Sequence, residues 1–361
     1  MYPKRRKRSQ SPGTQLSNLG VNRYRLTPDE EQMLETYRES KDVLEKECKL
    51  KGIDPTTVKH WWYKSKHISA FIKAKEKSVE DLKKELMEGM ARHSPAYPKI
   101  KRVVDKESYC LVIDPADVHI GKLATEYETG EKYNTKIAVK RVHDGINKIL
   151  KYASPYSIDK IVLIIGNDIL HTDGKNRTTT SGTPQDTDGQ WYQNFMTAKT
   201  LYIDIIEQLM MIADVHIMYD PSNHDYLAGW YLAQVVETWF RKSQNVTFDT
   251  SLRYRKAFVY HRNLIGTTHN DGAKEEMLPL LMAQEFKLEW SQTEHRYIYV
   301  HHKHHKTSKD YVGVTVETTR SPSSADGWHH KNGYQHAAQA IEGYLHHKTH
   351  GQIIRFTAVV A

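Results

Sequence analysis

Five strand-like apolar runs of this chain each lead directly into a group of histidine, aspartate or asparagine residues. Strand ends that feed loops at one edge of a sheet are where an α/β protein collects a site from distant parts of its sequence. The pattern therefore predicts an α/β fold with a metal-dependent hydrolytic site built around two metal ions. The runs are 111–114, 161–166, 215–219, 264–266 and 297–300, and the polar groups after them are 117–119, 167–171, 222–225, 269 and 301–304.

Alternating strand and helix patterns cover residues 106–361. Apolar runs separated by helical segments are typical of βαβ crossovers, so the first half is expected to form a parallel sheet. Strands then crowd together, which indicates partly antiparallel pairing. We expect two mixed β-sheets packed face to face under flanking helices, a four-layer sandwich. The predicted strands are 109–114, 160–166, 214–220, 255–261, 263–268, 296–302, 311–319 and 352–359, and the predicted helices are 134–153, 190–213, 226–242, 273–286 and 335–348.

Length and composition indicate a soluble protein with one large and one small domain. The chain has 361 residues, of which 39% are apolar and 27% charged. No run approaches the roughly 18 apolar residues of a membrane span, and the basic N-terminus lacks the apolar core of a secretory signal. We therefore expect a cytoplasmic protein of a bacterial or phage-infected cell that has no membrane partner. Cys48 and Cys110 lie in different predicted domains, so no disulfide framework is expected.

Positive charge is concentrated at the N-terminus. Seven Lys or Arg residues precede the first acidic residue, Asp29, whereas the whole chain has a net charge of +8. Residues 1–25 are predicted to be a disordered basic arm. Such an arm attracts phosphate groups without reading sequence, and the alternative is a solvated tail that keeps the protein soluble.

Residues 26–75 are predicted to form a small all-α helix-turn-helix domain. Thr27-Pro28-Asp29 is a typical helix start, and Gly52 lies between the next two helical stretches. Plain three-helix packing is the alternative. Residues 76–105 are predicted to be a helical spacer and linker, broken at Pro95 and Pro98. The side chains expected to face a DNA groove are Thr56, Thr57, Lys59, His60 and Lys64.

Taken in order, the five polar groups resemble the calcineurin-like metallophosphoesterase superfamily. The motifs are Asp-x-His at 117–119, Gly-x-Asp-x-x-His at 166–171, Asn-His-Asp at 223–225, a lone His269 and His-x-His at 302–304. The histidine three residues after the second-motif aspartate resembles the SbcD-type nucleases, and the whole chain is similar to phage-type phosphoesterases with an N-terminal helix-turn-helix. The resemblance covers the C-terminal two-thirds of the chain.

This resemblance implies a dinuclear centre with seven ligands. The first metal would be bound by Asp117, His119 and His304, and the second by Asn223, His269 and His302, with Asp168 bridging the two. Manganese is the preferred identity for both divalent ions, and iron, zinc, nickel or magnesium are alternatives. A hydroxide between the ions would be the nucleophile.

The resemblance also implies the catalytic groups. His224 would be the general acid, Asp225 would orient its ring, and His171 would lie beside a second proton-transfer route or the substrate. The last motif departs from the family pattern, because His301 stands where glycine is expected. The register of that motif could therefore shift, with His301 or His305 replacing an assigned ligand.

Three functional hypotheses remain open from the sequence. The first is a DNA phosphodiesterase, an exonuclease or endonuclease, with DNA as partner and room for a protein partner or homo-oligomer. The second is a phosphomonoesterase or small-nucleotide phosphodiesterase whose N-terminal module serves assembly. The third is a DNA-binding regulator or packaging component with an inactive phosphoesterase scaffold.

Overall fold

The structure of the protein is a computed structural model that describes residues 95–102 and 107–360. The basic arm, the predicted helix-turn-helix domain and most of the spacer lie outside these residues. So do the groove-facing candidates Thr56, Thr57, Lys59, His60 and Lys64. Among the described residues, no helix is both long and apolar enough to span a membrane.

The first sheet has six strands in the order β11-β10-β1-β2-β3-β4. Strands β1 to β4 run parallel to one another, whereas β10 lies antiparallel to both β1 and β11. The sheet is therefore mixed, as predicted. The bounds of its strands are β1 (Tyr109–Asp114), β2 (Ile158–Gly166), β3 (Asp214–Asp220), β4 (Val246–Asp249), β10 (Ala340–His347) and β11 (Gly351–Val359).

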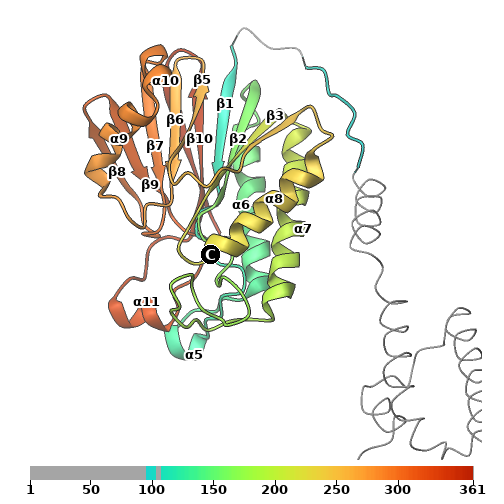
Figure 1. Ribbon diagram of the computed structural model, residues 1–361, viewed down its shortest axis with the longest axis vertical. Coiled ribbons are helices and arrows are strands. Elements are labelled where there is room, and N and C mark those ends of the chain that lie inside the picture. Colours follow the sequence, from blue (N-terminus) through green and yellow to red (C-terminus); the bar gives the residue numbers. More distant parts are fainter. Residues whose placement is uncertain (1–94, 103–106, 361) are drawn as a thin grey trace, which may run out of the picture. The chain divides into compact units, whose positions relative to one another are not determined.

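Three helices cover one face of this sheet (Figure 1): α6 (Thr135–Ala153), α7 (Trp191–Met210) and α8 (Tyr226–Phe240). Successive residues of a strand point to opposite faces, and β1 shows the result. Leu111 and Ile113 pack into the core under the helices, whereas Cys110 and Val112 point into the core between the two sheets. Burial on both faces explains why this strand is a continuous apolar run in the sequence.

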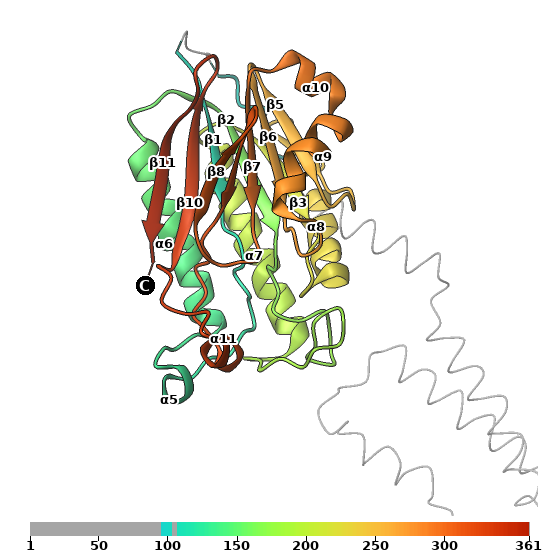
Figure 2. The same ribbon diagram turned by 90° about the vertical axis from the view of Figure 1, so that its left-hand side faces the viewer.

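The second sheet has five strands in the order β5-β6-β7-β9-β8, and it is also mixed. Its inner face packs against the first sheet (Figures 1 and 2), where the rings of Tyr299 and Tyr344 stack 3.8 Å apart. Its outer face is covered by η1 (Glu275–Met277), α9 (Leu278–Glu285) and α10 (Lys287–Gln292). The predicted four-layer sandwich is confirmed. The strands are β5 (Lys256–Tyr260), β6 (Asn263–Thr268), β7 (His295–Val300), β8 (Thr307–Tyr311) and β9 (Val314–Thr318).

Two element predictions were wrong. The helix predicted over 335–348 is strand β10, between β1 and β11, and each of its residues is buried. The helix propensity of these residues is overridden, because the strand pairs with a neighbour on each edge and packs on both faces of the sheet. The strand predicted over 311–319 contains β9 but starts too early, because residues 311–313 are the end of β8 and the turn of the β8–β9 hairpin, and β8 itself was not predicted. The hairpin turns at Gly313, whose φ of 78° is the left-handed conformation that glycine adopts without strain.

Residues 95–102, predicted as the linker that begins at the Pro95 and Pro98 break, form no helix and pack against the ends of α7 and α8. The Tyr97 ring stacks on Phe240 at 5.2 Å, and its hydroxyl accepts a hydrogen bond of 3.1 Å from Trp239. The amide of Ile100 donates to Asn245 at 2.9 Å. Residues 95–102 therefore lie at the C-terminal ends of α7 and α8. The loops before the N-terminal ends of these two helices follow β2 and β3, at the edge of the first sheet described in the next subsection.

Candidate metal centre

The carboxyl ends of β1, β2 and β3 meet at one edge of the first sheet because these strands are parallel. The ends of the parallel pair β6 and β7 lie at the matching edge of the second sheet (Figure 1). The short helices α5 (Glu126–Thr129) and α11 (Gly327–Asn332) flank this region. All five polar groups picked out in the sequence follow these strand ends, so the topology brings them together.

The backbone at this edge is strained. Ten non-glycine residues have positive φ among the described residues, and five of them are sequence-predicted metal ligands. Such conformations cost free energy and persist where the surrounding structure holds a functional arrangement. Gly166 at the end of β2 has a φ of 92°, and a Cβ atom there would lie 2.1 Å from the carbonyl oxygen of Asp220. The five ligand positions are Asp117, His119, Asp168, His302 and His304.

A first group of possible ligands consists of Asp117, His119 and His304. One donor atom from each lies within 4.8 Å of the other two. The Nε2 atoms of His119 and His304 are 3.3 Å apart, and His304 Nε2 lies 3.5 Å from Asp117 Oδ1. Oδ1 of Asp117 is buried and has no hydrogen-bond partner among the described residues. These three side chains therefore lie close enough to hold one divalent cation between them.

A second group consists of Asp168, His269 and His302, which also have donor atoms within 4.8 Å of one another. His269 Nε2 lies 3.4 Å from Asp168 Oδ2 and 2.8 Å from Asn223 Oδ1. The asparagine therefore adds a fourth oxygen or nitrogen donor to this group. All seven sequence-predicted ligands thus fall into two neighbouring groups, with the division that the resemblance implies for the outer ligands.

The donor chemistry of both groups suits divalent transition metals, since imidazole nitrogen and carboxylate or amide oxygen are combined. Burial and the neighbouring His224 hold the pKa of His119 well below its usual range, so its ring is neutral and offers a lone pair. Burial also lowers the pKa of His269, but the carboxylate of Asp168 outweighs it and raises this pKa to about 9. Burial would raise the pKa of Asp168, yet His269 and His224 hold it below its usual range.

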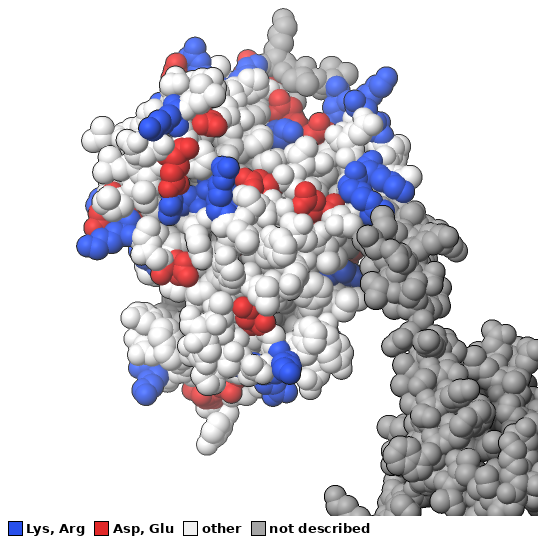
Figure 3. All heavy atoms as spheres, viewed as in Figure 1, with Lys and Arg blue, Asp and Glu red and all other residues white. Residues whose placement is uncertain are grey.

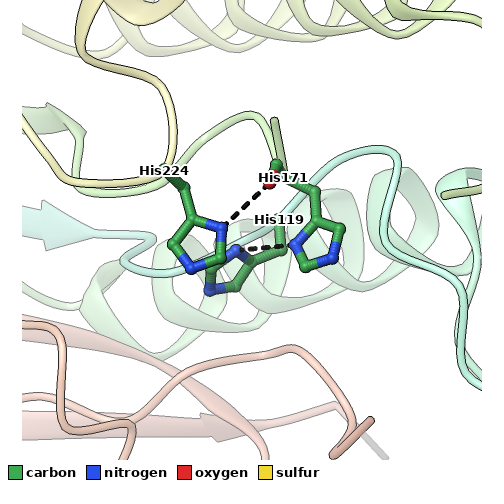
Figure 4. A group of neighbouring side chains, drawn as sticks. All are labelled: His119, His171 and His224. Atoms are coloured by element: carbon green, nitrogen blue, oxygen red, sulfur yellow. Dashed lines mark hydrogen bonds between the residues drawn. The ribbon is translucent and has the colours of Figure 1, made fainter. Parts of the chain in front are cut away.

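His171 and His224 lie against His119 on the side shown in Figure 4, where the three rings point toward one another. The Nδ1 atoms of His171 and His119 are 3.3 Å apart. His224 is held twice, because its amide donates to Asp168 Oδ1 at 3.0 Å and its Nδ1–H donates to the carbonyl of His171 at 2.9 Å. This second bond assigns the proton of neutral His224 to Nδ1 and leaves Nε2 for another partner.

Asp225, expected to orient His224, is placed elsewhere. Its carboxylate is fully buried and accepts hydrogen bonds from the amide of Leu170 at 2.8 Å and the hydroxyl of Ser222 at 2.7 Å. Burial, together with the nearby Asp168, raises the pKa of Asp225 to about 7. Asp225 thus joins the loops after β2 and β3 at the start of α8, and the ring of His224 is oriented by the His171 carbonyl instead.

The register of the last histidine motif follows from the partners of His301. This ring is fully buried, with Nδ1 donating to the carbonyl of Thr268 at 2.9 Å and Nε2 lying 2.8 Å from the carboxylate of Asp114. Burial lowers its pKa, but Asp114 outweighs this and raises it. His305 is exposed and bonded to the carbonyl of Lys303. His302 and His304 therefore face the ligand groups, whereas His301 joins the two sheets behind them.

The Asp114→Ala variant is expected to lower the free energy of unfolding by about 3 kcal/mol, because it removes the partner of the His301 ring in a fully buried pair. Chemical denaturation would measure this loss. The control is Glu294→Ala, which breaks the exposed pair with Arg262 at 3.0 Å and should cost less than about 1 kcal/mol. Equal stabilities of the two variants would contradict a structural role for the buried pair.

Sequence reasoning missed three residues beside the first ligand group, which are Lys122, Asp326 and His329. The ring of His329 stacks on His304 with centroids 5.2 Å apart, and its Nδ1 lies 2.7 Å from Asp326 Oδ1. The other carboxylate oxygen of Asp326 is 3.1 Å from the ammonium of Lys122, which is completely buried. Asp326 three residues before His329 is a readable helix start, but no pattern links it to His304.

Comparisons with known proteins were made on sequence and on structure. No protein-family model matches the chain, and no curated protein sequence does. Among solved structures, Vps29 from Chaetomium thermophilum has 12% identity and a TM-score of 0.31 over 70% of this chain and 99% of that one. Wild-type Vps29 from Entamoeba histolytica, complexed with Zn²⁺, has 10% identity and a TM-score of 0.27 over 70% and 99%. A conserved protein from Streptococcus pneumoniae, described as a predicted phosphoesterase, has 11% and 0.28 over 69% and 98%.

Proposed function

We propose that this protein is a dinuclear metal-dependent phosphodiesterase that hydrolyses DNA, a nuclease. The observation that carries the proposal is the convergence of seven donor side chains from five strand ends into two adjacent groups. Five of these residues hold strained backbone conformations, a cost that a scaffold without chemistry has no reason to keep. Two ions, with manganese preferred, would be held there.

The assignment of ligands follows the two groups. Asp117, His119 and His304 would hold the first ion, while Asn223, His269 and His302 would hold the second. We assign Asp168 as the bridging carboxylate because a carboxylate has two oxygens to share between two cations. When bound, paired divalent ions activate water near neutral pH and stabilise the charge of an in-line displacement at phosphorus.

In this proposal, His224 and His171, which lie beside the first ligand group, assist the departure of the leaving oxygen. His224 presents Nε2, and with its ring protonated on both nitrogens it would donate the Nε2 proton to that oxygen as general acid while Nδ1–H stays bonded to the His171 carbonyl. Its orientation comes from the His171 carbonyl and from the amide bond to Asp168, so the acid is tied to a proposed ligand. The ring of His171 would act as a positioning group for His119, since its pKa lies well below the usual range through burial and its Nδ1 faces His119 Nδ1.

DNA is proposed as the substrate because the sequence joins this centre to a basic arm and a predicted helix-turn-helix domain. Phosphomonoesters and small nucleotides are the alternative, in which the N-terminal region serves assembly. An inactive scaffold is disfavoured because all seven donors are chemically competent ligands. In this proposal, Asp225 holds the loops after β2 and β3 together through its bonds to Leu170 and Ser222.

The test is hydrolysis by the full chain in the presence of Mn²⁺, with and without a chelator. Linear DNA, a chromogenic phosphodiester and a chromogenic phosphomonoester would be compared side by side. Chelator-sensitive cleavage of DNA supports the proposal, whereas monoester turnover with intact DNA rejects it in favour of the alternative. Deleting residues 1–75 is expected to reduce DNA affinity while leaving hydrolysis of the small diester unchanged.

Metal binding is expected to release a proton and to strengthen as pH rises from 6 toward 9. The cause is His269, whose pKa of about 9 keeps its ring protonated at neutral pH until an ion replaces the proton. Calorimetric titration with Mn²⁺ in buffers of different ionisation enthalpy would measure the released proton. Binding that is independent of both pH and buffer would contradict the role of His269 as a ligand.

A further inference from the structure

The short helix α11 and the turn directly after it carry two large aromatic side chains that are mostly exposed. Trp328 is 62% exposed and Tyr334 is 64% exposed, and their rings lie 5.6 Å apart at a tilt of 35°. Single exposed apolar residues are ordinary on protein surfaces. A tryptophan and a tyrosine in contact form instead a larger apolar surface, whose exposed part can stack with a planar ligand.

The segment that holds this pair is well anchored. The Asp326 carboxylate caps α11 by accepting from the His329 amide at 3.0 Å, and the Tyr334 amide donates to the His329 carbonyl at 2.9 Å across Gly333. Asp326 is itself tied to the fully buried Lys122. The two rings are therefore presented by a capped turn rather than by a loose loop, which reduces the entropy lost when a ligand stacks.

The aromatic pair lies next to the proposed metal centre. The Trp328 ring contacts the His329 ring at 5.1 Å, and His329 stacks on the proposed ligand His304 at 5.2 Å. Two successive ring contacts, from Trp328 to His329 and from His329 to His304, thus connect the aromatic pair with the ligand group where a phosphate group would be held.

Charge on the surrounding surface points to bases rather than to phosphates as the main contacts. On the face shown in Figure 3, Lys and Arg side chains are interspersed with Asp and Glu side chains and form no continuous basic stripe. Nucleic-acid strands can also be held by stacking of bases on aromatic rings, which tolerates any sequence because every base has a flat face. Lys331, in the last turn of α11, supplies one exposed positive charge beside the pair.

We infer that Trp328 and Tyr334 form a nucleobase-stacking subsite that holds a base of the DNA strand next to the scissile phosphodiester. This inference rests on the proposed function and specifies its substrate: an unpaired nucleotide whose base is grasped while its phosphate lies at the metal centre. His329 and Asp326 position the subsite relative to His304.

The experiment compares Trp328→Ala and Tyr334→Ala with the unchanged protein on a single-stranded oligodeoxynucleotide. A second substrate is an oligomer of equal length in which tetrahydrofuran residues replace every nucleoside. Loss of one stacking contact should raise KM for the first substrate by roughly 5- to 150-fold with kcat nearly unchanged, and should not alter KM for the base-free oligomer. Trp328→Phe should restore most of the affinity. The control Tyr152→Ala removes a tyrosine that is 47% exposed on α6 and should change neither constant.

A binding measurement separates this inference from the proposed function. Calorimetry with Mn²⁺-loaded protein would compare deoxyadenosine 5′-monophosphate with inorganic phosphate, and neither requires DNA cleavage. Trp328→Ala should weaken the nucleotide and leave phosphate affinity unchanged. Equal losses for both ligands, or none for the nucleotide, would overturn the subsite even if DNA is cleaved. Conversely, intact DNA together with selective loss of nucleotide binding would reject the nuclease and retain the subsite.

Discussion

Replacing Asp168 by asparagine is expected to lower kcat for phosphodiester hydrolysis by roughly 10³-fold or more, the scale of losing a major electrostatic contribution at such a site. Asp168 is buried, and it faces His269 through one oxygen and the His224 amide through the other. Asparagine preserves the shape and can still accept from His224, but it removes the negative charge that we propose the two ions share. Turnover and metal content by elemental analysis would be measured on the same preparation.

The control for this variant is Asp144→Asn, which alters an exposed carboxylate paired with Lys140 on the surface of α6. It should retain full activity and metal content. DNA binding by the Asp168 variant should persist, because the predicted DNA-binding residues belong to the N-terminal region. Full turnover by Asp168→Asn with two ions bound would refute the bridging assignment and with it the dinuclear mechanism.

Replacing His224 by alanine is expected to lower kcat by about 10²- to 10⁴-fold, the usual contribution of a general acid, while both metal ions remain bound. The ring of His224 contacts the ligand His119 at a centroid distance of 4.7 Å and is oriented by the His171 carbonyl, yet it belongs to neither of the two ligand groups assigned here. A substrate with a good leaving group, such as a nitrophenyl diester, should be affected less than DNA, because its leaving oxygen needs no proton.

His305→Ala is the matched control, since this histidine follows the last motif but is exposed and bonded to the Lys303 carbonyl. It should leave both kcat and metal content unchanged. Loss of a metal ion from His224→Ala would instead place His224 among the ligands, because one ring nitrogen each of His119, His171 and His224 also lies within 4.8 Å of the other two. Equal loss on activated and unactivated substrates would contradict the proton-donor role.

The sandwich and the sheet edge that carries the metal centre could be predicted, because both depend on short runs of residues that can be recognised in the sequence. β1 and β3 have the predicted bounds, since each has a buried apolar centre that ends at an aspartate. Strand β10 could not be predicted in this way. Its helix-forming residues become a strand only because β1 and β11 supply hydrogen bonds on both edges.

Residue types and their order along the chain determined which side chains are available as ligands, because histidine, aspartate and asparagine at strand ends are recognisable without a structure. Only the tertiary structure decided how these side chains are used. It directs His301 to Asp114 and away from the ligand groups, assigns Asp225 to the loops after β2 and β3, and brings His329 and Trp328 beside His304. These outcomes depend on contacts between segments far apart in the chain, whose distances and directions are set by packing rather than by spacing in the sequence.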